Sequence, residues 1–116
     1  AAQSKLMTED RTYIVGAPAM RHTDNVANMK MQLAGEQRRN ALDPEGLLIV
    51  TAEDKIVRTY GDAAVASFTR HMNWRPSAEA VRSGSRNNTN SHLVTLVLAK
   101  VDSDWKIVHT HISLAR

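Results

Sequence analysis

The stretch Trp105-Lys106-Ile107-Val108-His109-Thr110-His111-Ile112-Ser113 decides how this chain folds. It alternates as a β-strand does, with successive side chains pointing to opposite faces of a sheet. One face would then carry Trp105, Ile107, His109 and His111. Because an imidazole can both give and take a proton near neutral pH, we predict His111 and His109 as a candidate acid–base pair. The alternative is that both rings fill the wall of the sheet and hydrogen-bond the backbone or Ser113.

A preceding strand ends at Val101, and the two strands should form an antiparallel hairpin. A two-residue turn at Asp102-Ser103 would pair Leu96 with His109. His92 would then lie on the same face as both histidines of the last strand. A slip of one residue in this register would move them to the opposite face.

The chain before this hairpin reads as a helix followed by strands. The expected elements are a short strand at 12–15, a helix from Thr23 or Asp24 to about Asn40, strands at 47–51, 55–60 and 63–74, and a long, mobile connection over 75–91. A helix followed by a run of antiparallel strands is typical of an α+β fold with the helix on one sheet face. With 116 residues, the chain (1–116) should form a single domain.

Both faces of the strand before the last turn are apolar, with Leu93 and Val97 on one face and Val94 and Leu96 on the other. An antiparallel sheet with one solvated face would alternate apolar and polar residues. Since only one clear helix is available as a cover, we infer that a second copy of the chain covers the other face in a homodimer. The alternative is that an N-terminal segment packs there.

Composition excludes several kinds of partner and site. The chain has no cysteine, which excludes disulfides and thiolate sites, and its net charge is only +3 with scattered basic residues. Five aromatic residues are too few for a stacking surface, so we expect no nucleic-acid partner. No apolar run approaches the ~20 residues of a membrane span, so we expect no membrane partner. The start at Ala1 leaves the compartment open, cytoplasmic or, if a signal peptide was removed, secreted or periplasmic.

Two segments resemble a known superfamily. Gly61-Asp62-Ala63-Ala64-Val65-Ala66-Ser67-Phe68-Thr69-Arg70 resembles the long central strand of SnoaL-like members of the nuclear transport factor two-like superfamily. The segment from Asp102 to Ser113 resembles the closing hairpin of the association (hub) domain of calcium/calmodulin-dependent kinase, in which a turn leads to Trp and Val-His-x-His-x-Ser. The segment from Leu6 to Val15 is similar to the start of small cyclase-like members.

The resemblance implies a cone-shaped fold, in which a strongly bent antiparallel sheet packs on helices around a pocket, and dimers formed through the sheet. It also implies a long helix before the first strand, which this chain either lacks or retains as a remnant at residues 1–10. Of two pocket arginines in the hub domain, Arg70 matches one, whereas Leu96 occupies the position of the other.

Arg70 is the leading candidate ligand-binding residue because it interrupts an apolar strand face with Phe68, Met72 and Trp74. A guanidinium buried without a partner is costly, and its geometry suits a carboxylate or enolate oxygen. The alternative is an ion pair with an acidic residue such as Glu45 or Asp54. Related enzymes often place a pocket hydroxyl on the first strand, where this chain has Tyr13.

Together with the resemblance, these residues imply a small-molecule pocket of the SnoaL-like type for a carbonyl or acidic ligand. If the protein is catalytic, the resemblance implies a cofactor-independent isomerase, cyclase or dehydratase. The sequence does not decide whether the protein is an enzyme. The alternative is a non-catalytic association module. His-x-His is also metal-ligand spacing, but no acidic residue stands nearby in the strands and Arg70 would oppose a cation, so we expect neither metal nor cofactor.

Overall fold

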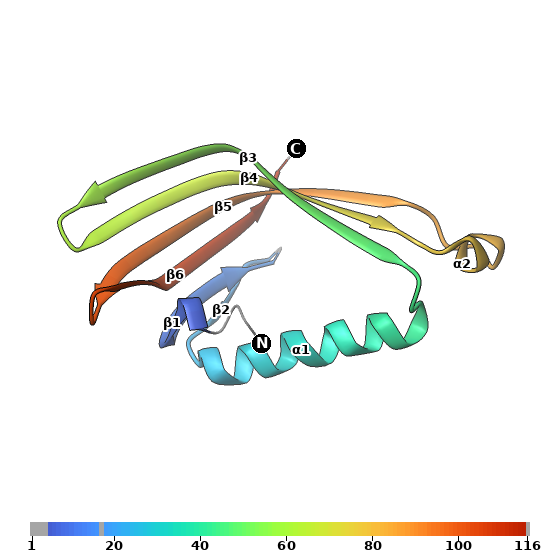
Figure 1. The fold of residues 1–116 in the computed structure, drawn as a ribbon, viewed down its shortest axis with the longest axis horizontal. Helices are drawn as coiled ribbons and strands as arrows, with labels where there is room; N and C mark the ends of the chain where they lie inside the picture. Colours follow the sequence, from blue (N-terminus) through green and yellow to red (C-terminus); the bar gives the residue numbers. More distant parts are fainter. Residues whose placement is uncertain (1–4, 17, 116) are drawn as a thin grey trace.

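The computed structural model describes residues 5–16 and 18–115. The elements, in order, are β1 (Met7–Val15), β2 (Met20–His22), α1 (Asn25–Leu42), β3 (Leu47–Tyr60), β4 (Ala63–Arg75), α2 (Ala78–Arg82), β5 (Asn88–Val101) and β6 (Asp104–Leu114). The strands form one six-stranded sheet in the order β2-β1-β6-β5-β4-β3. The sheet arches over α1, which lies beneath its concave side, and α2 lies at the far end of the long β4–β5 hairpin (Figure 1). The α+β, cone-like architecture is confirmed.

The helix α1 begins where its capping residue was expected. The Asp24 side chain accepts a hydrogen bond from the Ala27 backbone N–H at 3.1 Å, which satisfies one of the unpaired amides of the first turn. Arg39 lies in the last turn, where the negative end of the helix dipole favours a cation. Asn25 and Asn28 are the buried residues of this helix, so its inner face is polar at its N-terminal end. No helix in the described part of the chain is both long enough and apolar enough to cross a bilayer.

The sheet is mixed. All neighbouring pairs are antiparallel except β1 and β6, which run parallel, with Tyr13 beside Thr110 and Ile14 beside His111. The resemblance implied a strongly bent antiparallel sheet, and the sheet is antiparallel apart from this one pair.

A β-bulge in β6 overturns the expected register. Near the turn, Leu98 pairs with Ile107 as expected, but Val97 then pairs with His109 and Leu96 with Thr110. One residue of β6, Val108, is left without a partner of its own, and the face presented by every later side chain is reversed. The expectation that Leu96 faces His109 is therefore wrong.

Three other expectations also differ. Residues 7–10 belong to β1 and are not the remnant of a helix, while residues 1–4 lie outside the described residues. The 75–91 connection contains the short helix α2, because Ser77 caps it by accepting a hydrogen bond from Ala80 N at 3.2 Å. Residues 47–60 form one strand rather than two, with a bulge where Asp54 takes a positive φ of 54°.

The apolar core is small and lies under the concave face. Its fully buried hydrophobic residues are Ala64, Val94 and Ile112, from β4, β5 and β6. Fully buried polar residues of β1, α1 and β6 accompany them: Arg11, Asn25, Asn28 and Thr110. The concave side is therefore only partly filled by hydrocarbon.

The turn between α1 and β3 closes against an aromatic ring, and we predict that it tolerates no added methyl group. A Cβ on Gly46 would overlap Trp74 Cη2, and would lie 2.6 Å from Trp74 Cζ2 and 2.8 Å from Asp43 Oδ2. Gly46→Ala should therefore lower the free energy of unfolding by about 1–3 kcal/mol, measured by urea denaturation.

Gly35→Ala is the matched control, because the nearest atom to its added Cβ is Arg38 Nη2 at 3.8 Å and the site lies within α1. This substitution should raise the free energy of unfolding by up to ~1 kcal/mol. Equal stability of the Gly46 variant and the wild type would contradict the close packing of Trp74.

Candidate functional site

The concave side of the sheet holds two adjoining hollows between the strands and α1. The first has a volume of about 280 Å³ and the second about 710 Å³. The residues common to both are Tyr13, Gln32, Phe68 and Arg70. We call the pair the concave cavity.

Arg70 lies at the centre of the concave cavity, since it lines both hollows. Its Nη2 lies 3.4 Å from Nδ1 of His92, its partner on β5, and its buried Nε has no hydrogen-bond partner. Neither Glu45 nor Asp54 forms an ion pair with it, and among the described residues no carboxylate neutralises it. A partly buried guanidinium with a free donor is a place where an anion or a carbonyl oxygen can bind.

His92 is held neutral by its surroundings. Burial lowers the pKa of His92 below its ordinary value, and the positive charge of Arg70 lowers it further. In the neutral ring, Nδ1 accepts the hydrogen bond from Arg70 while Nε2 carries the proton. His92 is therefore available as a proton acceptor after a change of tautomer or contact, beside the cavity residue Arg70.

Arg11 is the residue of the cavity that sequence reasoning missed. It is 2% exposed, and it donates from Nε to Asn25 Oδ1 at 2.8 Å and from Nη1 to Thr110 Oγ1 at 3.0 Å. Its guanidinium carbon lies 4.7 Å from the centre of the Tyr13 ring. The feature of the sequence that could have identified Arg11 is its spacing of two residues from Tyr13 on a strand, which puts both side chains on one face.

The histidines of β6 lie elsewhere. Because of the bulge, Ile107, Thr110 and Ile112 line the first hollow, whereas His109 and His111 are absent from the described lining residues of both hollows. His111 Nε2 lies 3.3 Å from Ser113 Oγ, the contact expected if the ring has a structural role. Any proton-transfer role of His109 or His111 would belong to the convex face of the sheet.

The structure brings most of the predicted ligand-binding side chains together. Tyr13, Phe68 and Met72 line the concave cavity with Arg70. Trp74 lines a neighbouring hollow, where its ring lies 5.9 Å from the guanidinium carbon of Arg39. Their part in binding a ligand stays a prediction.

A second histidine cluster lies on the convex face. His71 Nδ1 lies 2.7 Å from Ser91 Oγ, and His71 Nε2 lies 3.3 Å from Glu53 Oε2. The order serine, histidine and carboxylate matches a nucleophilic triad, but the Glu53 side chain is 63% exposed, so solvent screens its carboxylate. We therefore assign the cluster to the pairing of β3, β4 and β5.

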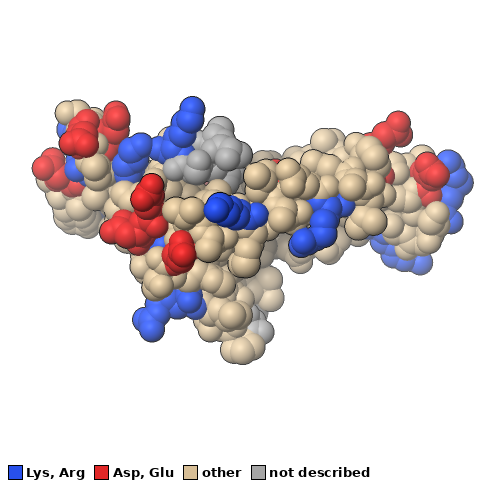
Figure 2. All heavy atoms as spheres, turned by 90° about the horizontal axis from the view of Figure 1, so that it is seen from below, with Lys and Arg blue, Asp and Glu red and all other residues tan. Residues whose placement is uncertain are grey.

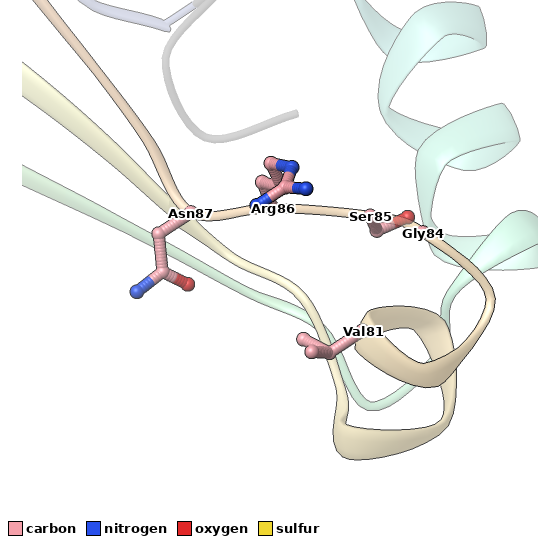
Figure 3. Close-up of a pocket in the computed structure, with 5 residues that line it drawn as sticks. All are labelled: Val81, Gly84, Ser85, Arg86 and Asn87. Atoms are coloured by element: carbon pink, nitrogen blue, oxygen red, sulfur yellow. The ribbon is translucent and has the colours of Figure 1, made fainter.

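A hollow of about 370 Å³ lies beside α2, outside the cone. Its lining residues are Val81, Gly84, Ser85, Arg86 and Asn87, all exposed (Figure 3). No buried polar side chain points to a ligand there. Across the described residues no group of three His, Asp or Glu side chains is placed to hold a metal ion.

The surface charge is mixed. Basic and acidic side chains occur together at both ends of the molecule on the side seen in Figure 2. An extended basic patch, which nucleic-acid binding would need, is not visible on that side.

The sequence and fold have known relatives. The model of the SnoaL-like domain family matches residues 5–116. The chain is similar in structure to a putative ketosteroid isomerase from Shewanella frigidimarina, with a TM-score of 0.69, 18% identity, and coverage of 95% of this chain and 78% of that one.

It is also similar to the association domain of C. elegans CaMKII, with a TM-score of 0.65, 19% identity, and coverage of 95% and 76%. The corresponding values for the β subunit of benzoate 1,2-dioxygenase from Burkholderia mallei are 0.74, 10%, 98% and 76%. No curated protein matches the sequence. At these identities the structural likeness shows the fold alone.

We predict that the environment of His92 makes stability depend on pH. Because its pKa is lowered in the folded state, the unfolded chain binds the proton more tightly, so stability falls as pH decreases through ~6.5 towards the folded pKa. An NMR titration should show His92 titrating below the ordinary histidine range. Arg70→Met should raise that pKa only in part, because burial is the larger cause.

The matched variant is His92→Gln, whose stability should decrease less than that of the wild type between pH 7.5 and 5.5. An unchanged His92 pKa in the Arg70→Met protein would contradict the contact between the two side chains.

Proposed function

We propose that this chain, which belongs to the SnoaL-like family, binds a small organic molecule in its concave cavity through a carboxylate or carbonyl oxygen at Arg70. The apolar body of the ligand would lie against Phe68, Met72 and Val94, which line the same cavity. Tyr13 would offer its hydroxyl group as a further donor.

The uncompensated charge of Arg70 carries this proposal. Its Nε is buried without a partner, its one hydrogen-bonding neighbour is a neutral imidazole, and no described carboxylate pairs with it. Burying a cation in this way costs free energy that a bound anion would offset. An oxygen of the ligand would complete the hydrogen bonding of the guanidinium.

If the bound molecule reacts, the residues present favour a proton transfer. Arg70 would stabilise an enolate oxygen, and neutral His92 beside it would take or return a proton. This chemistry corresponds to an isomerisation, cyclisation or loss of water, which requires no cofactor. The structural likeness to a putative ketosteroid isomerase supports a reaction of this class.

The test of the proposal is selective binding of a carboxylate. Hexanoate should raise the melting temperature, since a ligand that binds only the native state stabilises it, whereas the neutral hexanamide should have a smaller effect. Arg70→Met should weaken hexanoate binding about 10- to 100-fold by calorimetry, because a charge-assisted hydrogen bond of about 1.5–3 kcal/mol is lost.

The control variant is Arg58→Met, because Arg58 pairs with Val65 on the convex side of the sheet. Its affinity for hexanoate should equal that of the wild type. Equal affinities of hexanoate for the Arg70 and Arg58 variants would refute the role of Arg70.

The convex face supports a second proposal, that two copies of the chain associate through it. Its exposed apolar side chains include Leu93 on β5, 56% exposed, Val65 on β4, 38% exposed, and Ile56 on β3. Side chains of this kind on three adjacent strands are typical of a surface that is covered by a partner. The likeness to association domains of CaMKII supports self-association in particular.

We predict that Leu93→Glu converts a dimer into a monomer, because it would bury two carboxylates in the same interface. Sedimentation velocity measures the change. Leu42→Glu is the control, since Leu42 is 87% exposed at the end of α1 and away from the convex face. A wild-type protein that sediments as a monomer at high micromolar concentration would refute the association.

A further inference from the structure

We infer that Arg11 forms a second anion-binding subsite in the concave cavity, so that its preferred ligand is a small dianion with one acidic group at Arg70 and the other at Arg11. This inference rests on the proposed function and names the substrate class of the same cavity. It would make the protein a binder or catalyst of small dicarboxylates or of compounds with two comparable acidic groups.

The first argument is the burial and partial satisfaction of Arg11. Asn25 Oδ1 and Thr110 Oγ1 each accept one hydrogen bond from it, but its buried Nη2 has no partner. Asn25 is itself fixed, because its amide nitrogen donates to the Thr8 carbonyl oxygen at 3.1 Å. The side chain is therefore held in place with a donor left over, which is the condition of a preformed binding group.

The second argument is charge. Arg11 and Arg70 both line the first hollow, and no acidic side chain is among its described lining residues. Glu36 of α1 lines the second hollow, which Arg39 also lines, and it forms no ion pair with Arg70. Glu9, two residues before Arg11 on β1, lines a different hollow together with Lys30. Neutral partners satisfy hydrogen bonds but leave both positive charges in place, so two negative charges are needed to match them.

The third argument is the apolar lining that accompanies the two guanidinium groups. The Tyr13 ring contacts Arg11, and Phe68 lies two residues from Arg70 on the same face of β4. With Val94 and Leu96 they give the first hollow an apolar part beside its charged groups. Its volume of about 280 Å³ is just below the usual range for ligand pockets, which suits a short aliphatic chain bearing an acid at each end.

An arginine with a purely structural role would make the same hydrogen bonds to Asn25 and Thr110, which join β1, α1 and β6. That role predicts no preference for a second acidic group on the ligand. The two roles are therefore distinguished by ligand selectivity rather than by the stability of Arg11 variants.

The experiment compares succinate, glutarate and adipate with butyrate, valerate and hexanoate, the monocarboxylates of equal chain length, by calorimetry with the full chain at constant ionic strength. At least one diacid should bind more than tenfold tighter than its monoacid. Arg11→Gln should reduce that ratio several-fold, Arg11→Lys should reduce it less, and Arg58→Gln on the convex side should leave it unchanged.

Each outcome tests one or both of two statements, the second subsite at Arg11 and the proposed function at Arg70. Binding of monoacids without any preference for diacids overturns the second subsite and leaves the proposed function standing. Binding of no carboxylate overturns both. If Arg11→Gln fails to fold, the preference of the wild type for diacids and the Arg11→Lys protein still decide. A diacid preference that Arg11→Lys fully retains, with the same salt dependence, supports a subsite in which any cationic side chain at this position suffices.

Discussion

Two hydrogen bonds from one buried guanidinium join three elements of this fold. Arg11 lies on β1 and donates to Asn25 at the start of α1 and to Thr110 on β6, so the last strand meets the first strand and the helix at one side chain. Its burial lowers its pKa, although a nearby Tyr13 acts in the opposite direction, and the cation persists at neutral pH because an arginine starts from a very high value. The fold therefore buries a positive charge in its core, and this charge lies at the concave cavity.

The bulge at Val108 determines which chemistry faces this charge. Without it, His109 and His111 would follow Ile107 on the concave face. With it, Thr110 and Ile112 occupy that face, and Thr110 supplies the hydroxyl that accepts from Arg11. One extra residue thus replaces a pair of titratable rings by a neutral acceptor and a hydrocarbon wall, and it leaves His92 as the histidine in contact with Arg70.

Periodicity was sufficient to predict α1, the last three strands and the α+β architecture, because the Asp24 cap and the alternation along β4 and β5 are local signals. It did not predict β2 or the full lengths of β1 and β3. It also pointed to Arg70 as a residue of the cavity wall, since a charged residue on an apolar strand face stands out in the sequence, and its part in ligand binding stays a prediction. The positions of His109 and His111 could not be predicted in this way, because a bulge depends on how two strands pair and twist. Arg11 was missed because its burial results from α1 closing over β1, a tertiary contact, whereas its spacing from Tyr13 indicates only the face of the strand that it occupies.

The two faces of the sheet separate the proposed ligand site from the proposed association surface. Alternation along β4 puts Phe68, Arg70 and Met72 on the concave face, and Val65, Ser67 and Thr69 on the convex face. A substitution on one face therefore changes one function directly and reaches the other only through the backbone of the sheet. This separation lets an association module and a binding pocket occupy one chain of 116 residues, so the two functions proposed for it are compatible rather than exclusive.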